Sequence, residues 1–111
     1  MTNSLLPPPT SQCRETVVAY GWASPAVGLS AAAQAERIRR HCQSEGWEVT
    51  SELLSRRFPE LVELTRRAME TNARRVVLTR DALAELERRY PEIWGEVRAR
   101  LEARCVAIVV C

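Results

Sequence analysis

The chain has 111 residues, of which 46% are hydrophobic, so its length suits one globular domain and leaves no room for a second core. Sixteen basic residues, all arginine, oppose fourteen acidic ones, and the net charge of +2 is too small to indicate a nucleic-acid-binding protein by charge alone. The four cysteines lack a CxxC pair and the single histidine, His41, adjoins Cys42, so neither a metal site nor a cofactor is expected. The first residues lack the apolar stretch of a signal peptide or membrane span, which predicts a cytoplasmic protein with free thiols and no membrane contact.

Residues 1–14 contain three consecutive prolines, Pro7 to Pro9, which supply no amide donors and favour extended, solvated backbone. We expect a disordered tail here and a single folded domain over residues 15–111. A proline-rich ligand for a partner domain is the alternative interpretation of the tail.

The first element of the domain is the apolar run Thr16–Tyr20, which lacks polar alternation and therefore predicts a strand covered on both faces of a parallel sheet. The loop from Gly21 to Gly28 follows it and contains Ser24. In open α/β sheets the loops at the carboxyl ends of the strands form the ligand crevice, so function is expected near Ser24.

A helix should begin after Ser30, a good N-cap, and end at Gly46, since its apolar positions recur at steps of three and four residues. Residues 47–54 predict a second strand. The next helix is expected to start at Pro59, because proline suits the first helical position. Its inward positions should be Leu61, Leu64 and Ala68.

Residues 75–79 predict a third buried strand, and residues 105–111 a fourth of uninterrupted apolar character. The apolar stripe between them contains Pro91, which cannot donate a helical hydrogen bond, so a kink or a pair of helices is expected near Tyr90. This alternation predicts a three-layer α/β/α sandwich around a four-stranded, mainly parallel sheet of order 2-1-3-4, with Ser24 and Asp81 at one edge.

Several blocks of this sequence resemble motifs of the catalytic domain of serine recombinases, the resolvases and invertases. The run Tyr20-Gly21-Trp22-Ala23-Ser24 is similar to that family's Tyr-x-Arg-x-Ser motif, and Ser30 to Gln34 to the start of its first helix. The pair Gly46-Trp47 resembles the start of its second strand. The blocks 58–61 and 80–85 are similar to its Arg-Pro-x-Leu and Leu-Asp-Arg-Leu-x-Arg motifs.

The resemblance implies a resolvase-like fold with Ser24 as the nucleophile, accompanied by Gln34, Asp81 and Tyr20. The family surrounds the attacked phosphate with arginines, because guanidinium groups stabilise the negative charge of the transition state. At the matching positions this chain has other residues, namely Trp22, Phe58, Ala82 and Glu85. Arg57, one position away, is the displaced survivor, and Arg56 and Arg80 are candidate binding residues. Ser24 is therefore expected to be a vestigial nucleophile.

Compared with the family, the sequence is expected to lack the carboxyl-terminal dimerisation helix and the DNA-binding domain. Each site residue also has a structural interpretation: a loop hydroxyl for Ser24, a helix N-cap for Asp81 and a surface position for Gln34. A Ser/His/Asp triad is not expected, since His41 falls near the far end of its helix. Arg56, Arg57, Arg74 and Arg75 have few local partners, and a phosphate-binding patch is one interpretation of them.

Two functions are weighed. The first is a non-catalytic, recombinase-like module that associates, as a homo-oligomer or with another recombinase-like protein, and that is DNA-linked at most weakly. It draws on exposed apolar surface expected at Trp22, Phe58 and Trp94. The second is a DNA strand-exchange domain that uses Ser24. A flavodoxin-like ligand-binding module is a third, although the loop after the first strand lacks GxGxxG spacing.

Overall fold

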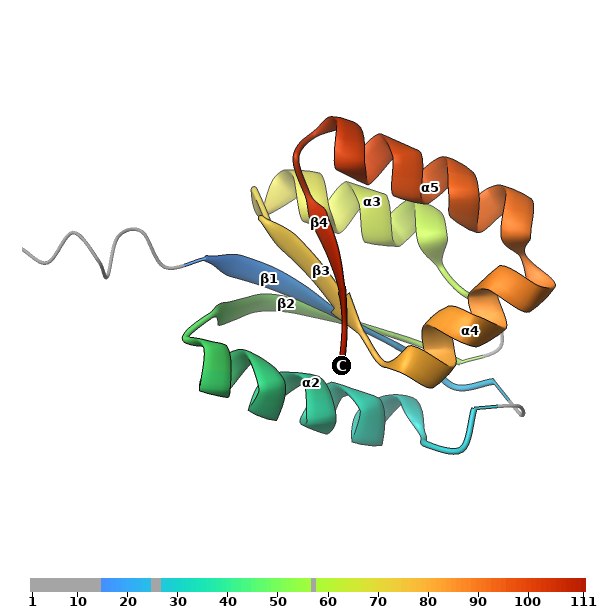
Figure 1. Cartoon of the computed structure of the whole chain (residues 1–111), viewed down its shortest axis with the longest axis horizontal. Coiled ribbons are helices and arrows are strands. Elements are labelled where there is room, and N and C mark those ends of the chain that lie inside the picture. The colour runs from blue at the N-terminus through green and yellow to red at the C-terminus, as the bar shows by residue number, and fades with distance from the viewer. Residues whose placement is uncertain (1–14, 25–26, 57) are drawn as a thin grey trace, which may run out of the picture.

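The computed structural model describes residues 15–24, 27–56 and 58–111. The expected tail, residues 1–14, and Arg57 lie outside the described residues. Strands and helices alternate in the order predicted, and the helix that follows the first strand is labelled α2 (Figure 1). The elements are β1 (Thr16–Trp22), α2 (Ala31–Glu45), β2 (Glu48–Ser55), α3 (Leu61–Glu70), β3 (Arg75–Leu78), α4 (Arg80–Arg89), α5 (Pro91–Ala103) and β4 (Ala107–Val110).

All four strands are parallel and lie in the order β2-β1-β3-β4, which confirms the predicted topology. β1 is an interior strand: Thr16 pairs with Glu48 of β2, and Val17 pairs with Arg75 of β3. The register between β1 and β2 shifts after Val17, where β2 carries one extra residue, Thr50. Such a bulge bends the strand locally, and here the Thr50 hydroxyl donates a hydrogen bond to the Val17 carbonyl (3.3 Å).

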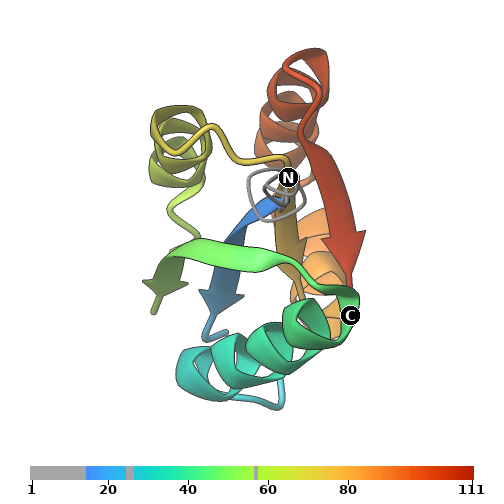
Figure 2. The ribbon, with the colours of Figure 1, turned by 90° about the vertical axis from the view of Figure 1, so that its left-hand side faces the viewer.

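The sheet is covered on both faces, as a three-layer arrangement requires. α2 lies on one face and α3, α4 and α5 lie on the other (Figure 2). Because successive side chains of a strand point to opposite faces, Val17 and Ala19 pack toward α2, whereas Val18, Tyr20 and Trp22 pack toward the other three helices.

The ends of α2 follow the sequence signals. The Ser30 hydroxyl accepts a hydrogen bond from the Ala33 amide (3.1 Å), and Gly46 closes the helix with a left-handed φ of 79°. The predicted start of α3 at Pro59 is wrong, because the helix begins at Leu61 and Glu60 is its N-cap.

The apolar stripe between β3 and β4 forms two helices, as predicted from the position of Pro91. α4 ends at Arg89 and α5 starts at Pro91, with Tyr90 between them. The ring of Tyr90 lies 5.8 Å from the ring of Trp22, centroid to centroid, so the break between the helices is packed against the end of β1.

The expectation that Trp22 and Trp94 form exposed apolar surface is wrong. Trp22 is 0% exposed and Trp94 is 2% exposed, and both belong to the larger core cluster. Phe58, in contrast, is 71% exposed. Of these three residues, only Phe58 can therefore contribute to an interface without rearrangement of the core.

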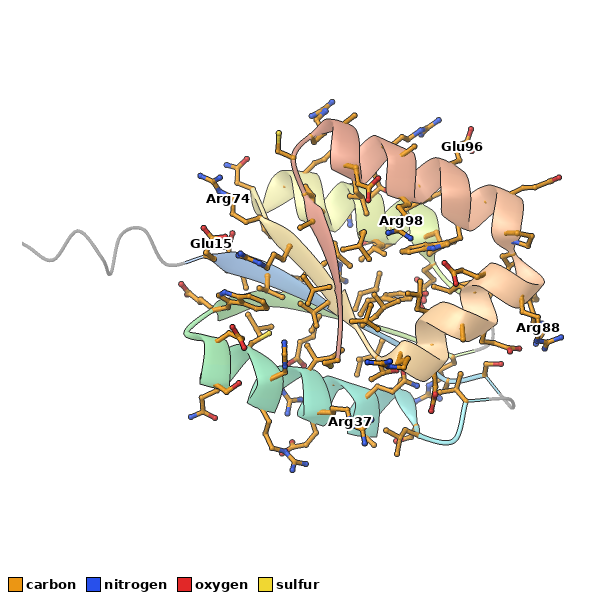
Figure 3. The ribbon with its side chains drawn as sticks, viewed as in Figure 1. Glu15, Arg37, Arg74, Arg88, Glu96 and Arg98 are labelled. Atoms are coloured by element: carbon orange, nitrogen blue, oxygen red, sulfur yellow. The ribbon has the colours of Figure 1, made fainter. Side chains whose placement is uncertain are left out.

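Of the four arginines grouped in the sequence as one phosphate-binding patch, the three that the structure describes do not lie together. Arg56 follows the carboxyl end of β2, whereas Arg74 precedes β3 and Arg75 begins it, so they lie at opposite ends of a parallel sheet. Figure 3 shows Arg74 at the end of the molecule away from Arg88 of α4. Arg75 forms an ion pair with Glu15 and lies 4.2 Å from the ring centroid of Trp47.

Candidate functional site

Ser24 and Asp81 lie at the same edge of the sheet, as predicted. Ser24 follows the end of β1 by two residues, and Asp81 lies in the first turn of α4, directly after β3. Because β1 and β3 are adjacent and parallel, their carboxyl ends meet at one edge. This edge is the candidate functional site.

Ser24 is not an open loop hydroxyl. The residue is only 5% exposed, and its backbone amide and carbonyl bond to Trp22 (3.2 Å) and Val27 (2.9 Å) within the turn. Its side chain lies close enough to the carboxylate of Glu85, on the inner side of α4, to lower the pKa of that carboxyl group.

Glu85 is held by two arginines of its own helix. Its carboxylate accepts hydrogen bonds from Arg88 (2.8 and 3.1 Å) and lies 3.7 Å from Arg89. The hydrogen bond from Arg88 is the main cause that lowers the pKa of Glu85, and it outweighs the opposing effect of burial; the charges of both arginines and the Ser24 hydroxyl lower it further. Glu85 is therefore ionised at neutral pH.

A carboxylate of this kind is a poor general base. Proton transfer is most efficient when the pKa of the base lies near the working pH, and the pKa of Glu85 is shifted the other way. The carboxylate therefore adds little driving force for deprotonation of the Ser24 hydroxyl.

Gln34 is neither a surface residue nor a free site residue. It is 0% exposed, and its amide oxygen accepts a hydrogen bond from the Trp22 amide (3.0 Å). Its amide nitrogen donates to the carbonyls of Trp22 (2.7 Å) and Leu29 (2.9 Å). Both donors are used, so Gln34 fixes the end of β1 and the loop that carries Ser24 to the first turn of α2.

Tyr20 is fully buried in the larger core cluster, on the side of the sheet that α3, α4 and α5 cover. Burial raises the pKa of its hydroxyl to about 12, although the nearby Ser55 hydroxyl and Glu60 backbone oppose the rise. The hydroxyl makes no hydrogen bond of good geometry within the described part of the chain. Tyr20 therefore belongs to the core, as does Trp22, and the role of both residues in binding stays a prediction.

The remaining predicted residues are exposed. Asp81, Arg56 and Arg80 lie at the carboxyl edge, but the predicted N-cap role of Asp81 is wrong, because the Thr79 hydroxyl accepts the capping hydrogen bond from Ala82 (3.3 Å). His41 packs edge-on against Trp47, which precedes β2 at the opposite edge, and takes no part in the site. In residues 15–24, 27–56 and 58–111, no group of three or more His, Cys, Asp or Glu side chains could hold a metal ion, and no helix is long and apolar enough to cross a membrane.

The fold has a solved relative. The chain is similar in structure to the C-terminal catalytic domain of ISC1926 TnpA, an IS607-like serine recombinase, with a TM-score of 0.63. The match covers 86% of this chain and 68% of that one at 15% sequence identity. No protein-family model and no curated protein matches the sequence. The protein has a recombinase-like α/β fold.

Within this recombinase-like fold, the contact between Ser24 and Glu85 is what sequence reasoning missed. The sequence identifies Glu85 only as a replacement for an expected arginine. Its position four residues after Asp81, one helical turn into α4, was the available signal, because such a spacing places both residues on neighbouring parts of one helix face.

Proposed function

We propose that this protein is a recombinase-like α/β module that works through association with other protein chains and does not carry out serine-mediated DNA strand exchange. One observation carries the second half of this proposal: Ser24 and Glu85 are both buried, and the Ser24 side chain lies close enough to the ionised carboxylate of Glu85 to influence its pKa. The similarity to the catalytic domain of a serine recombinase supports the first half at the level of the fold.

The electrostatics at Ser24 oppose phosphoryl transfer. The transition state of attack on a phosphodiester carries negative charge, which preorganised cationic donors must stabilise. The charged group that influences Ser24 is the carboxylate of Glu85, and the cations next to it, Arg88 and Arg89, already bind that carboxylate. A phosphate approaching Ser24 would have to compete with Glu85 for both arginines.

A strand-exchange enzyme is the second candidate, and one observation favours it. The carboxyl edge that carries Ser24 also carries the exposed side chains of Arg56 and Arg80, which have no ion-pair partner among the described residues. These two guanidinium groups could contact a DNA backbone. Their presence does not supply an activated nucleophile.

The decisive experiment asks whether Ser24 becomes covalently attached to phosphorus. The protein is incubated with a nicked suicide duplex that carries the recombination site of a related serine recombinase, and separately with a fluorophosphonate probe, which requires no DNA sequence. We expect no adduct by intact-protein mass spectrometry. An adduct that Ser24→Ala abolishes would overturn the proposal.

A matched variant identifies the cause of inactivity. Glu85→Gln keeps the shape of the side chain and removes its charge, so an adduct in this variant alone would assign the block to the carboxylate. Replacing Trp22 by arginine is not informative, because Trp22 is completely buried and a charged side chain there would disrupt the core.

A further inference from the structure

Three large hydrophobic side chains are exposed along the segment where β2 leads into α3, and two of them, Leu54 and Phe58, line one hollow. Leu54 is 40% exposed, Phe58 is 71% exposed and Val62 is 82% exposed. In the part of the chain that the structure describes, the one other exposed large hydrophobic is Ile93 on α5, at 52%. Single exposed apolar residues are common on proteins, whereas a cluster marks an interaction surface.

Two shallow hollows lie at this junction. Leu54, Arg56, Phe58 and Glu60 line the first, of about 480 Å³. The second, of about 570 Å³, shares Leu54 and Arg56 with it and reaches the start of α2 at Ser30. We call the four residues of the first hollow the β2–α3 patch.

Among the described residues that line it, the β2–α3 patch carries charges of both signs. It contains one cation, Arg56, and one anion, Glu60, and neither has an ion-pair partner in residues 15–24, 27–56 and 58–111. A surface with both signs and two apolar side chains does not favour a polyanion such as DNA, which selects clustered positive charge. It favours a protein partner with the same mixture.

In a twofold-symmetric dimer the two subunits meet through the same patch. Every contact between two residues therefore occurs twice, once in each direction across the interface. Arg56 and Glu60 line the same hollow and stand two residues before and two residues after Phe58 in the sequence, so under this symmetry Arg56 of each copy can meet Glu60 of the other. Leu54 and Phe58 would then be buried between the copies.

We infer that the β2–α3 patch is the surface through which this protein binds a second copy of itself, with Phe58 as the apolar anchor and reciprocal Arg56–Glu60 ion pairs around it. This inference rests on the proposed function, since it names the partner and the surface of the proposed association. Large aromatic side chains at the centre of an interface with charged groups at its rim are typical of stable protein contacts.

The test uses charge reversal on the full chain, with the dimer dissociation constant measured by sedimentation equilibrium over roughly 1 µM to 1 mM. Arg56→Glu and Glu60→Arg each place like charges opposite one another in a homodimer, so each alone should weaken dimerisation by about tenfold or more. Mixing the two variants restores opposite charges at both contacts. The mixture should therefore form a heterodimer close to wild-type affinity.

Matched substitutions separate the patch from general effects. Phe58→Asp should weaken dimerisation, whereas Ile93→Asp, which introduces the same charge at the exposed hydrophobic residue outside the patch, should not. Arg74→Glu, at the opposite edge of the sheet, is the control for charge reversal. Circular dichroism and thermal unfolding of every variant establish that each one is folded.

Three results would overturn the inference. The first is a wild type that stays monomeric over the whole concentration range, which would assign the patch to a different partner. The second is a dimer whose dissociation constant is unchanged by the single charge reversals. The third is a mixture of the two variants that does not recover wild-type affinity. None of these bears on the Ser24 adduct experiment. Failure of this surface and failure of the non-catalytic proposal are therefore distinguishable.

Discussion

The side chain of Ser24, in the loop after β1, lies close enough to the carboxylate of Glu85, in the second turn of α4, to lower the pKa of that carboxyl group. The sequence identifies Ser24 as the expected nucleophile and Glu85 as the replacement for an arginine of the same site, and the structure places these two side chains next to each other. This contact has consequences for stability as well as for chemistry.

Glu85→Gln should destabilise the protein at neutral pH and have a smaller effect in acid. The pKa of Glu85 is lowered in the folded state, so its contribution to stability is fully present above the unfolded value near 4.5 and is lost as the pH falls through the folded value. Urea unfolding of wild type and variant between pH 7 and pH 3 measures this. Glu87→Gln, an exposed glutamate on the same helix, is the control, and a difference for Glu85→Gln that does not change with pH would contradict the assignment.

Gln34→Ala should lower the free energy of unfolding by about 3 kcal/mol, because it leaves buried backbone groups of Trp22 and Leu29 without their partners. Chemical denaturation provides the measurement. Gln43→Ala removes an exposed glutamine from the same helix and should cost less than about 0.5 kcal/mol. Equal effects at the two positions would show that the buried amide does not fix the Ser24 loop.

Tyr20→Phe should change stability at pH 7 by less than about 1 kcal/mol, because the hydroxyl it removes has no well-formed hydrogen bond within the described residues. At alkaline pH the two proteins should diverge. The pKa of Tyr20 rises from 10.0 in the unfolded chain to about 12 in the folded protein, so the unfolded chain loses the phenol proton at lower pH. The contribution of Tyr20 to stability is therefore fully present below pH 10 and is lost as the pH rises toward 12. The variant should lack this loss, and ultraviolet absorbance of tyrosinate monitors the titration in the wild type.

Two glycines should respond to alanine in opposite directions. A Cβ at Gly21 would lie 2.7 Å from the Ala31 carbonyl oxygen and 3.2 Å from Leu54 Cδ2, so Gly21→Ala must displace backbone and should cost about 1–3 kcal/mol. A Cβ at Gly95, in α5, would meet nothing within 4 Å, so Gly95→Ala should stabilise the helix by about 0.5–1 kcal/mol. Thermal melts of the two variants in parallel measure the difference. A Gly21→Ala variant that melted at or above the wild-type temperature would show that the close approach of β1 to α2 is not required.

The sequence contained enough information for the topology, because each buried parallel strand is a short run without polar alternation and each connection has helical periodicity. It also carried a signal for Trp22 that the family resemblance obscured. Trp22 stands two residues after Tyr20 and four after Val18, so the period of a strand places all three on one face, which is the core face. Because Trp22 matches the arginine of the Tyr-x-Arg-x-Ser motif, the resemblance predicted a site residue instead of a core residue.

Other features could not be predicted from the sequence. Thr79 and Asp81 are both good N-cap residues two positions apart, and only the exact end of β3 decides between them. Gln34 is a helix residue whose partners, Trp22 and Leu29, lie in a preceding strand and loop. The Ser24–Glu85 contact likewise depends on the distance between a loop and a helix from different crossovers, and the spacing of Glu85 from Asp81 indicates only the helix face on which Glu85 lies.

The position of β1 between β2 and β3 also sets constraints on how the chain folds. Each half of the sheet is a crossover unit of modest length, with Thr16 opposite Glu48 in one and Arg75 opposite Ala107 in the other. The seam that joins them, Val17 opposite Arg75, closes a much longer loop. The entropy cost of closing a loop rises with its length and must be met before the contacts form, so the two crossover units should form first and the β1–β3 seam last. Until that seam closes, β1 and β3 each present an open edge, and the nascent protein is most prone to pair with another chain.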